Sequence, residues 1–233
     1  MHNNICIIPA RGGSKRIPRK NIKDFLGKPI IAYSIEAAIR SGLFNEVMVS
    51  TDDKEIAEAA IKYGAKVPFF RSDKNANDFA TTYDVLEEVL ESSCYKGMNF
   101  ENACCIYPCA PLISTEKLIE GFNLLLSENF EMVLPVVEYD FPIQRSLKFK
   151  NTDKKNIEYA FPEYAVTRSQ DLPERFHDIG QFYWFNIKSI LKSKSLFVDN
   201  TGAIVLDRVV SQDIDNMEDW TLTELKYRML NGI

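Results

Sequence analysis

The sequence lacks the patterns that mark disulfide-bonded, zinc-binding and membrane-spanning proteins. Its five cysteines are an odd number, include the neighbours Cys104 and Cys105, and form no CxxC motif. They predict neither a disulfide framework nor a zinc site, and we interpret them as small buried apolar side chains. No apolar run approaches the ~20 residues of a membrane span, and the stretch from Ile5 to Ala10 is too short for a signal-peptide core. We expect a cytoplasmic protein without a membrane partner.

The sequence also lacks the excess of positive charge with which proteins coat nucleic acids or anionic membranes. It has 28 Lys and Arg residues against 33 Asp and Glu residues, a formal net charge of −5. The charge is uneven, because residues 11–28 hold seven Lys or Arg residues and one Asp, a net charge of +6 that leaves −11 on the other 215 residues. A compact basic segment on an acidic protein indicates a small polyanionic ligand and no nucleic-acid partner.

Short apolar runs alternate with helical patterns over the first 140 residues. Ile5 to Pro9 is typical of a buried strand, and Pro29 to Ser41 predicts a helix because isoleucine recurs every four residues before Gly42. The same reasoning predicts strands at Glu46 to Ser50, Cys104 to Tyr107 and Met132 to Val137, and helices that begin with capping boxes at Asp52/Glu55 and Thr81/Asp84 and with a cap at Ser114. This alternation predicts an α/β fold with a Rossmann-like, mainly parallel sheet, helices on both faces and right-handed crossovers.

The alternation stops after residue 140. Phe141 to Phe149, a hydrophilic turn and Ile157 to Phe161 predict a β-hairpin that leaves the main sheet. The aromatic row Phe182 to Phe185 can be a doubly buried strand or a platform for a sugar. A last strand and a last helix are predicted at Ala203 to Leu206 and Met217 to Leu230. No linker divides the chain, so we expect a single domain over residues 1–233 with a protruding arm at about 141–161.

The segment after the first predicted strand, PARGGSKRIPRKN at 9–21, is rich in glycine and positive charge. Ligands of parallel α/β sheets bind at the carboxyl ends of the strands, where this loop begins. It offers two glycines for close backbone approach, a hydroxyl donor and three cations: Gly12, Gly13, Ser14, Arg11, Lys15 and Lys20. The pattern is neither a P-loop nor the GxGxxG fingerprint, which disfavours a redox Rossmann enzyme. It can be a solvated basic loop, but the density of cations beside two glycines favours a polyphosphate site.

Asp213 and Asp215 form a second motif, in SQDIDN at 211–216. Side chains alternate in an extended segment, so the two carboxylates face the same way. Such a pair suits Mg²⁺, which takes one or two carboxylates and completes its shell with water and substrate phosphates. Asp215 with Glu218 can instead cap the last helix. The polyphosphate loop favours the metal site, because a nucleoside triphosphate arrives with Mg²⁺.

These motifs resemble those of the CMP-sialate synthetases, cytidylyltransferases that activate nine-carbon acidic sugars. The similarity covers nearly the whole chain, through IIPARGGSKRIPRKN, KPIIAYSIEAA, VSTDD at 49–53, the segments 71–82 and 108–111, and DIDNMEDW at 213–220. Within the family, the branch that acts on pseudaminic acid is the most similar, on PIQRSL at 142–147, TRSQDLPERFHD at 167–178 and GQFYW at 180–184. The resemblance implies a nucleotide-diphospho-sugar transferase fold and a homodimer in which each arm reaches the neighbour's sugar site.

The resemblance also implies roles for individual residues. It implies a triphosphate or cytidine site at Arg11, Ser14, Lys20 and Asn21, further nucleotide contacts at Arg71 and Thr82, and a metal pair at Asp213 and Asp215. Thr82 can equally belong to a helix start. Tyr107 stands where sialate synthetases usually have Gln, so that contact is not carried over, and we expect Tyr107 to pack or to serve as a platform for the sugar.

The reaction implied is attack of the sugar's anomeric hydroxyl on the α-phosphorus of CTP, with release of pyrophosphate and no covalent nucleophile. Arg11, Lys15 and Lys20 would stabilise charge on the leaving pyrophosphate. A Mg²⁺ ion on Asp213 and Asp215 would polarise the α-phosphate.

Recognition of the sugar carboxylate calls for a planar donor fork, and Arg145 and Arg168 are the candidates. Gln181 can bond sugar substituents. His177 can act as a base, although a lone histidine more often has a structural role. Two alternatives stay open: the same reaction on sialic, legionaminic or another keto-acid sugar, and a non-catalytic nucleotide-binding module.

Overall fold

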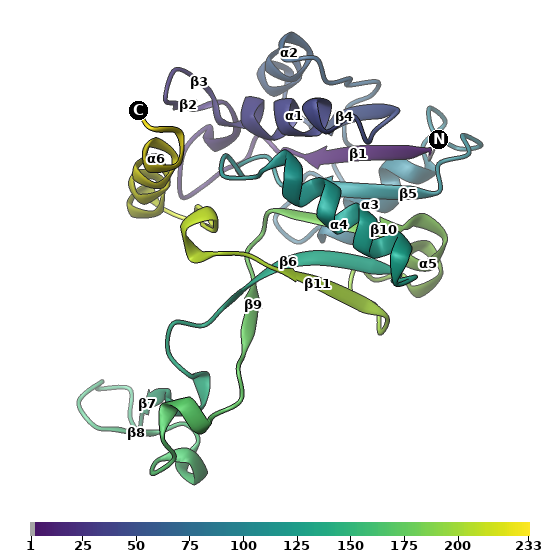
Figure 1. The fold of residues 1–233 in the computed structure, drawn as a ribbon. Helices are drawn as coiled ribbons and strands as arrows, with labels where there is room; N and C mark the ends of the chain where they lie inside the picture. Colours follow the sequence, from purple (N-terminus) through teal and green to yellow (C-terminus); the bar gives the residue numbers. More distant parts are fainter. Residues whose placement is uncertain (1–2) are drawn as a thin grey trace.

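The computed structural model describes residues 3–233, in which a seven-stranded sheet lies between two layers of helices (Figure 1). The strands are β1 (Asn4–Pro9), β2 (Asp24–Phe25), β3 (Lys28–Pro29), β4 (Glu46–Ser50), β5 (Asn102–Ile106), β6 (Met132–Glu138), β7 (Leu147–Phe149), β8 (Ile157–Tyr159), β9 (Phe176–Asp178), β10 (Phe182–Asn186) and β11 (Thr201–Val205). The helices are α1 (Ile30–Ser41), α2 (Lys54–Lys62), α3 (Thr82–Glu91), α4 (Thr115–Ser127), α5 (Ile187–Ser193) and α6 (Met217–Asn231).

The main sheet is mostly parallel, as predicted, in the order β11-β6-β10-β5-β1-β4. β1 pairs in parallel with β4 and β5, and β11 pairs in parallel with β6. β10 is antiparallel to both of its neighbours, and β9 is antiparallel to the end of β6. Pro9 aligns with Ser50, so β1 and β4 end at the same edge of the sheet, where a ligand site is expected.

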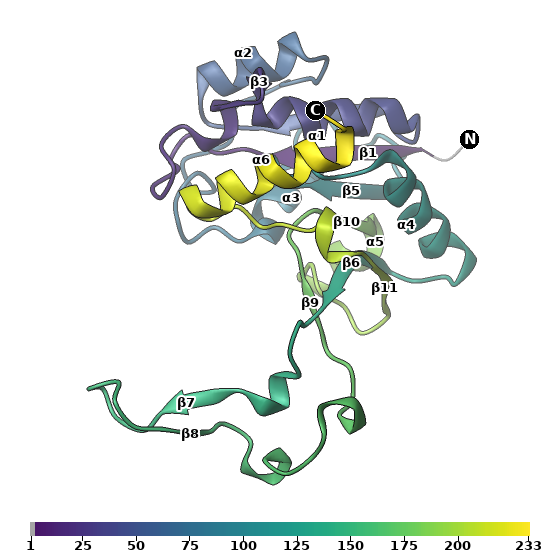
Figure 2. The same cartoon turned by 60° about the vertical axis from the view of Figure 1, so that its left-hand side comes forward.

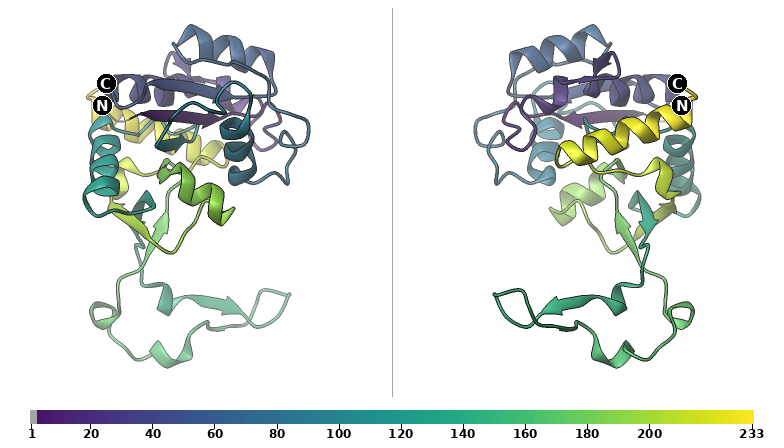
Figure 3. Two further views of the ribbon diagram at one scale, coloured as in Figure 1. Left: turned by 90° about the vertical axis from the view of Figure 1, so that its right-hand side faces the viewer. Right: turned by 90° about the vertical axis from the view of Figure 1, so that its left-hand side faces the viewer.

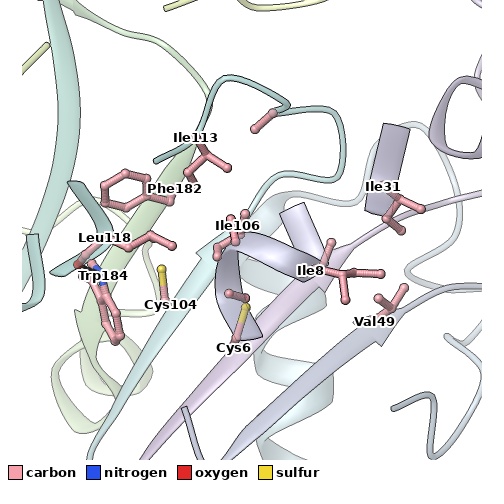
Figure 4. Packing of buried hydrophobic residues seen from close by; sticks show 14 of the residues in the cluster. Cys6, Ile8, Ile31, Val49, Cys104, Ile106, Ile113, Leu118, Phe182 and Trp184 are labelled. Carbon is pink, nitrogen blue, oxygen red and sulfur yellow. Dashed lines mark hydrogen bonds between the residues drawn. The ribbon is translucent and has the colours of Figure 1, made fainter. Parts of the chain in front are cut away.

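Helices cover both faces of the sheet because the apolar side chains of the strands alternate. Cys6 and Ile8 point to a core shared with α1, α2 and α4, part of which Figure 4 shows, whereas Ile5 and Ile7 point to a core shared with α3 and α5. Phe182 to Phe185 in β10 are all buried. The aromatic row is therefore a doubly buried strand and not a sugar platform.

Most predicted helix starts are confirmed, and one is wrong. Thr81 and Asp84 form the capping box of α3, and Ser114 caps α4. α2 is capped by Asp53 and not by Asp52, since the Asp53 side chain accepts from the Ile56 amide. Asp52 instead accepts a hydrogen bond from the Gly12 amide, 2.8 Å away. The β5 strand also begins and ends earlier than the predicted Cys104 to Tyr107.

A third buried cluster joins the basic loop to the last helix. Ile17 of the loop, Phe25 of β2 and Ile30 of α1 pack with Ile214 and with Trp220 of α6. The ring of Phe25 meets that of Trp220 edge-on, with centroids 5.5 Å apart. This packing brings the Asp213–Asp215 segment beside the loop that follows β1.

The chain between β6 and β9 leaves the sheet as an arm, which we define as residues 139–175 (Figures 2 and 3). The predicted hairpin is confirmed, since β7 and β8 pair in antiparallel register from Leu147↔Tyr159 to Phe149↔Ile157. The arm extends beyond the 141–161 expected, and its hairpin exposes Leu147, Phe149 and Ile157 to solvent.

All five cysteines are free, and Cys6, Cys104 and Cys105 are fully buried as small apolar side chains. Within residues 3–233, no helix combines the length and the apolar character needed to cross a bilayer.

Candidate active site

The basic loop leaves the carboxyl end of β1 and is fixed by polar contacts of its backbone. Gly12 donates to Asp52, and the buried Asn21 donates from Nδ2 to the Arg11 carbonyl at 2.9 Å. A Cβ on Gly12 would lie 2.8 Å from Asp53 Oδ2, so glycine permits the close approach at this position. Gly13 has open space at the equivalent point, with nothing within 4 Å.

The loop and the Asp213–Asp215 segment lie side by side. Lys20 donates from Nζ to the Ile214 carbonyl at 2.7 Å, and Arg16 forms an ion pair with Asp215 at 2.6 Å. These contacts join residues almost two hundred positions apart in the chain, and they depend on the packing of Ile17 with Ile214.

A cavity of about 350 Å³ opens where the two segments meet. It is lined by five of the residues expected to bind nucleotide and by one of the two aspartates, namely Arg11, Ser14, Lys15, Lys20, Asn21 and Asp215. Its volume is within the range of small-molecule sites. The cavity therefore combines several donors with a carboxylate.

The two aspartates suit a divalent cation. Ile214 is buried between them, while Asp213 and Asp215 remain accessible. The pKa of Asp213 is raised, first by partial desolvation of its carboxyl group and then by the charge of Asp215. Within the described residues no group of three or more metal-ligating side chains is found, so an ion here would complete its shell with water and phosphate oxygens.

Asp215 does not cap the last helix. The N-cap of α6 is Asn216, whose side chain accepts from the amides of Glu218 and Asp219, and Asp219 accepts from the Asn216 amide in return. The capping alternative for Asp215 with Glu218 is therefore wrong, and the Asp215 carboxylate is left facing the loop.

Asp213 lines a second and larger cavity of about 640 Å³. His177, Arg208 and Lys226 also line it, together with the start of the arm. The two aspartates thus line different cavities, since Asp215 belongs to the one beside the basic loop. This is the arrangement that a reaction between a phosphate and a second substrate requires.

Arg71 lies beside the end of β4 and Thr82 beside the residue that follows β5, and neither lines the loop cavity. Arg71 is buried and donates from Nε to Ser50 Oγ at 3.0 Å, and burial lowers its pKa. Thr82 is the first residue of α3, and its hydroxyl is 3.0 Å from the Tyr107 hydroxyl. Tyr107 packs edge-on against Tyr183, as expected of a packing residue.

The four residues expected to bind the sugar lie in three different environments. Arg145 and Arg168 are on the arm, where Arg145 donates to the Thr167 carbonyl and Arg168 pairs with Asp171, and neither lines the two cavities. Gln181 is buried and donates to the Val210 carbonyl at 2.6 Å, which is a structural contact.

His177 is the member of this group that lines the larger cavity. Its Nδ1 is 2.9 Å from the Asp178 carbonyl oxygen. A carbonyl only accepts, so this contact favours the tautomer with the proton on Nδ1 and leaves Nε2 unprotonated.

Three charged residues of the site had no recognisable pattern in the sequence. Asp78 forms ion pairs with both Arg11 and Lys15. Arg208 and Lys226 are cations of the larger cavity, and Lys226 donates to the Ser211 carbonyl at 2.7 Å. Each comes from a segment whose local sequence indicates only a loop or a helix.

A parallel sheet with a basic, glycine-containing loop after its first strand and a carboxylate pair beside that loop defines a nucleotidyltransferase. The chain belongs to the cytidylyltransferase family, whose sequence model matches residues 5–191. The resemblance to the CMP-sugar synthetases is thereby confirmed.

Curated relatives support this membership, and a solved structure shows the same fold. The chain is 40% identical over 227 residues to a pseudaminic acid cytidylyltransferase of Campylobacter jejuni, covering 97% of each chain. It is 30% identical to a CMP-N,N'-diacetyllegionaminic acid synthase of Legionella pneumophila, covering 94% of each. A CMP:2-keto-3-deoxy-manno-octonic acid synthetase solved with CTP has the same fold, with a TM-score of 0.68, 18% identity and coverage of 99% of this chain and 100% of that one.

Proposed function

We propose that this cytidylyltransferase transfers CMP from CTP to pseudaminic acid and releases pyrophosphate. The observation that carries the proposal is the aspartate pair, of which Asp215 lines the cavity of the basic loop and Asp213 lines a larger cavity beside the arm. The identity of 40% to an enzyme named for pseudaminic acid supports the choice of sugar.

The loop cavity is assigned to the triphosphate. Arg11, Lys15 and Lys20 bear the charge that develops on the leaving pyrophosphate, and the Ser14 hydroxyl donates a hydrogen bond. Bound Mg²⁺, held by Asp213 and Asp215, would supply Lewis acidity at the α-phosphate. The chain's own residues align the two reactants for direct displacement, so no covalent nucleophile is needed.

The larger cavity is assigned to the sugar, with the anomeric hydroxyl toward Asp213. His177, with Nε2 unprotonated, can accept a proton or a hydrogen bond from a sugar hydroxyl. Arg208 is engaged by Asp140 and by the Tyr139 carbonyl, and Lys226 by backbone carbonyls, so both cations hold the walls of the cavity.

The arm is assigned to a homodimer contact. Its hairpin exposes Leu147, Phe149 and Ile157, and an exposed apolar surface of this kind is typical of an interface. Arg145 and Arg168 lie on the same arm and away from both cavities of their own chain. We propose that they reach the sugar site of the second protomer.

The proposal is tested by pyrophosphate release from CTP and Mg²⁺ with a panel of acidic sugars. Pseudaminic, N,N'-diacetyllegionaminic and N-acetylneuraminic acids should be compared at equal concentration, with a no-sugar blank. We expect the largest kcat/KM with pseudaminic acid. A preference for legionaminic acid would change the sugar assigned as the substrate. No pyrophosphate release with any of the three sugars would contradict the proposal.

A further inference from the structure

Asp78 forms ion pairs with two of the cations that are proposed to bind the triphosphate. One carboxylate oxygen pairs with Arg11 at 2.5 Å and the other pairs with Lys15. Both cations line the loop cavity, whereas Asp78 comes from the segment between Arg71 and α3. The pKa of Asp78 is lowered by its hydrogen bonds to Lys15 and Arg11, so the carboxylate stays charged.

This contact imitates a phosphate group. Two anionic oxygens, one on each cation, are what a phosphate would present to Arg11 and Lys15. A cation that donates to Asp78 has fewer donors to offer a ligand, so the carboxylate and the ligand compete for them. The side chain of Asp78 is 39% exposed, which allows it to be displaced without disturbing the core.

Among the other acids around the loop, Asp215 pairs with Arg16 of the cavity and belongs to the proposed metal pair. Asp53 and Glu55 bind Arg19, which does not line the cavity, and Asp53 also caps α2. The Asp78 side chain caps no helix, and its hydrogen bonds within residues 3–233 are those with Arg11 and Lys15. Its position is therefore explained by the two cations alone.

We propose that Asp78 is an internal competitor of the triphosphate that selects for polyphosphate ligands. A ligand with β- and γ-phosphates brings enough negative charge to displace the carboxylate, and CMP, which lacks them, leaves it in place. The inference rests on the proposed use of the loop cavity. It predicts that removing the charge of Asp78 strengthens the binding of CTP and pyrophosphate and leaves the binding of CMP unchanged.

The test compares Asp78→Asn with Asp73→Asn, a control that removes the same charge from an exposed position of the same segment. Binding of CTP, pyrophosphate and CMP is measured by titration calorimetry in EDTA at low ionic strength, and the KM for CTP is measured with Mg²⁺. Because exposed ion pairs are weak, we expect about 3- to 10-fold tighter CTP and pyrophosphate binding in Asp78→Asn, with the gain reduced by added salt. Thermal unfolding checks that both variants fold.

The outcomes separate this inference from the proposed function. Wild-type protein that neither binds CTP nor turns it over with any sugar contradicts the proposed function. Wild-type protein that does both, with Asp78→Asn binding CTP no better than Asp73→Asn, overturns the inference alone. Weaker CTP binding in Asp78→Asn also overturns it, because Asp78 would then hold Arg11 and Lys15 in place for the ligand. An equal gain for CMP overturns the selection for polyphosphates.

Discussion

Asp215 is available to a ligand because the residue after it caps the helix. Asn216 takes the N-cap of α6, so the Asp215 carboxylate faces the loop, where Arg16 balances its charge. Asp213 lies on the other side of the buried Ile214 and faces the larger cavity. The two aspartates on either side of Ile214 therefore line different cavities, although simple alternation along the segment predicts that they face the same way.

Substitution of Asp215 tests this role. We expect Asp215→Asn to lower kcat at least about 10-fold, since a charge-assisted contact made in the transition state is worth ~1.5–3 kcal/mol. Glu218→Gln is the matched control, because it removes an exposed carboxylate from the next turn. Turnover is measured as pyrophosphate release and folding by circular dichroism. Wild-type turnover in a folded Asp215→Asn protein would exclude the role assigned.

Asp53 makes stability depend on pH. The hydrogen bond from Arg19 holds the pKa of Asp53 below its ordinary value of 3.8. The pKa of Asp53 is lower in the folded protein than in the unfolded chain. The stabilisation from the ion pair is therefore complete at a pH above the unfolded-state pKa, and it is lost as the pH falls through the folded-state pKa. Asp53→Asn keeps a good helix cap but loses the ion pair.

We therefore expect Asp53→Asn to lower the free energy of unfolding by up to about 1 kcal/mol at neutral pH, an amount limited by solvent screening. The difference from wild type should shrink as the solution is acidified below the ordinary aspartate range. Urea unfolding at neutral pH and in acid measures the difference in the free energy of unfolding. Glu55→Gln is the comparison, because Glu55 is the more exposed partner of Arg19. A difference that persists unchanged in acid is incompatible with this linkage.

At the scale of elements, short sequence patterns predicted the features that depend on neighbouring residues, such as the start of a helix. The isoleucine period before Gly42 predicted α1, and Thr81 with Asp84 predicted the start of α3. The start of α2 was wrong because Asp52 and Asp53 are both good caps, and the choice depends on the distant Gly12 amide that binds Asp52. The insertion of β10 between β5 and β6 had no local pattern at all, since strand order is fixed by packing.

The same distinction holds for the site. The basic loop and the aspartate pair were found because each is a short motif whose chemistry lies in adjacent residues. Asp78, Arg208 and Lys226 were missed because each reaches the site through tertiary structure. The contact between Lys20 and Ile214 shows how the two motifs become one site only in the fold.

The pairing of β11 with β6 depends on a glycine. A Cβ added at Gly202 would lie 2.4 Å from a ring carbon of Phe130, which is much closer than two carbons can approach. The ring packs against the core and cannot move aside without cost, so we expect Gly202→Ala to lower the free energy of unfolding by about 1–3 kcal/mol.

Denaturant unfolding measures this loss. Gly13→Ala is the control for stability, because nothing lies within 4 Å of its added Cβ. Combining Gly202→Ala with Phe130→Ala should cost less than the sum of the two changes, since the second removes the ring that the first strikes. Additive losses would show that this contact is not the cause.

At the scale of the whole molecule, the arm carries two residues predicted to bind the sugar and holds them away from both cavities of their own chain. Arg145 and Arg168 make only short-range contacts on the arm, with Thr167 and Asp171. A guanidinium on a protruding arm can serve a sugar carboxylate only if the arm of one protomer meets the cavity of another. The apolar hairpin supplies a surface for that association.

Mixed dimers test whether the arm acts on the neighbouring site. Asp215→Asn disables a protomer's own site and keeps its arm, whereas Arg168→Ala keeps the site and disables the arm. If the arms act between protomers, mixing two nearly inactive variants restores about a quarter of wild-type turnover, because half of the dimers are mixed and one of their two sites is complete. The proteins are unfolded and refolded together, and light scattering verifies that dimers form.

The matched control mixes Asp215→Asn with Asp213→Asn, both of which keep the wild-type arm. Every site in that mixture lacks one aspartate of the pair, so we expect no recovery of turnover. Recovery only in the mixture with Arg168→Ala therefore requires an arm that acts across the dimer. Recovery absent from both mixtures would show that the arm serves its own chain, whereas wild-type turnover of Arg168→Ala alone would show that Arg168 serves no site.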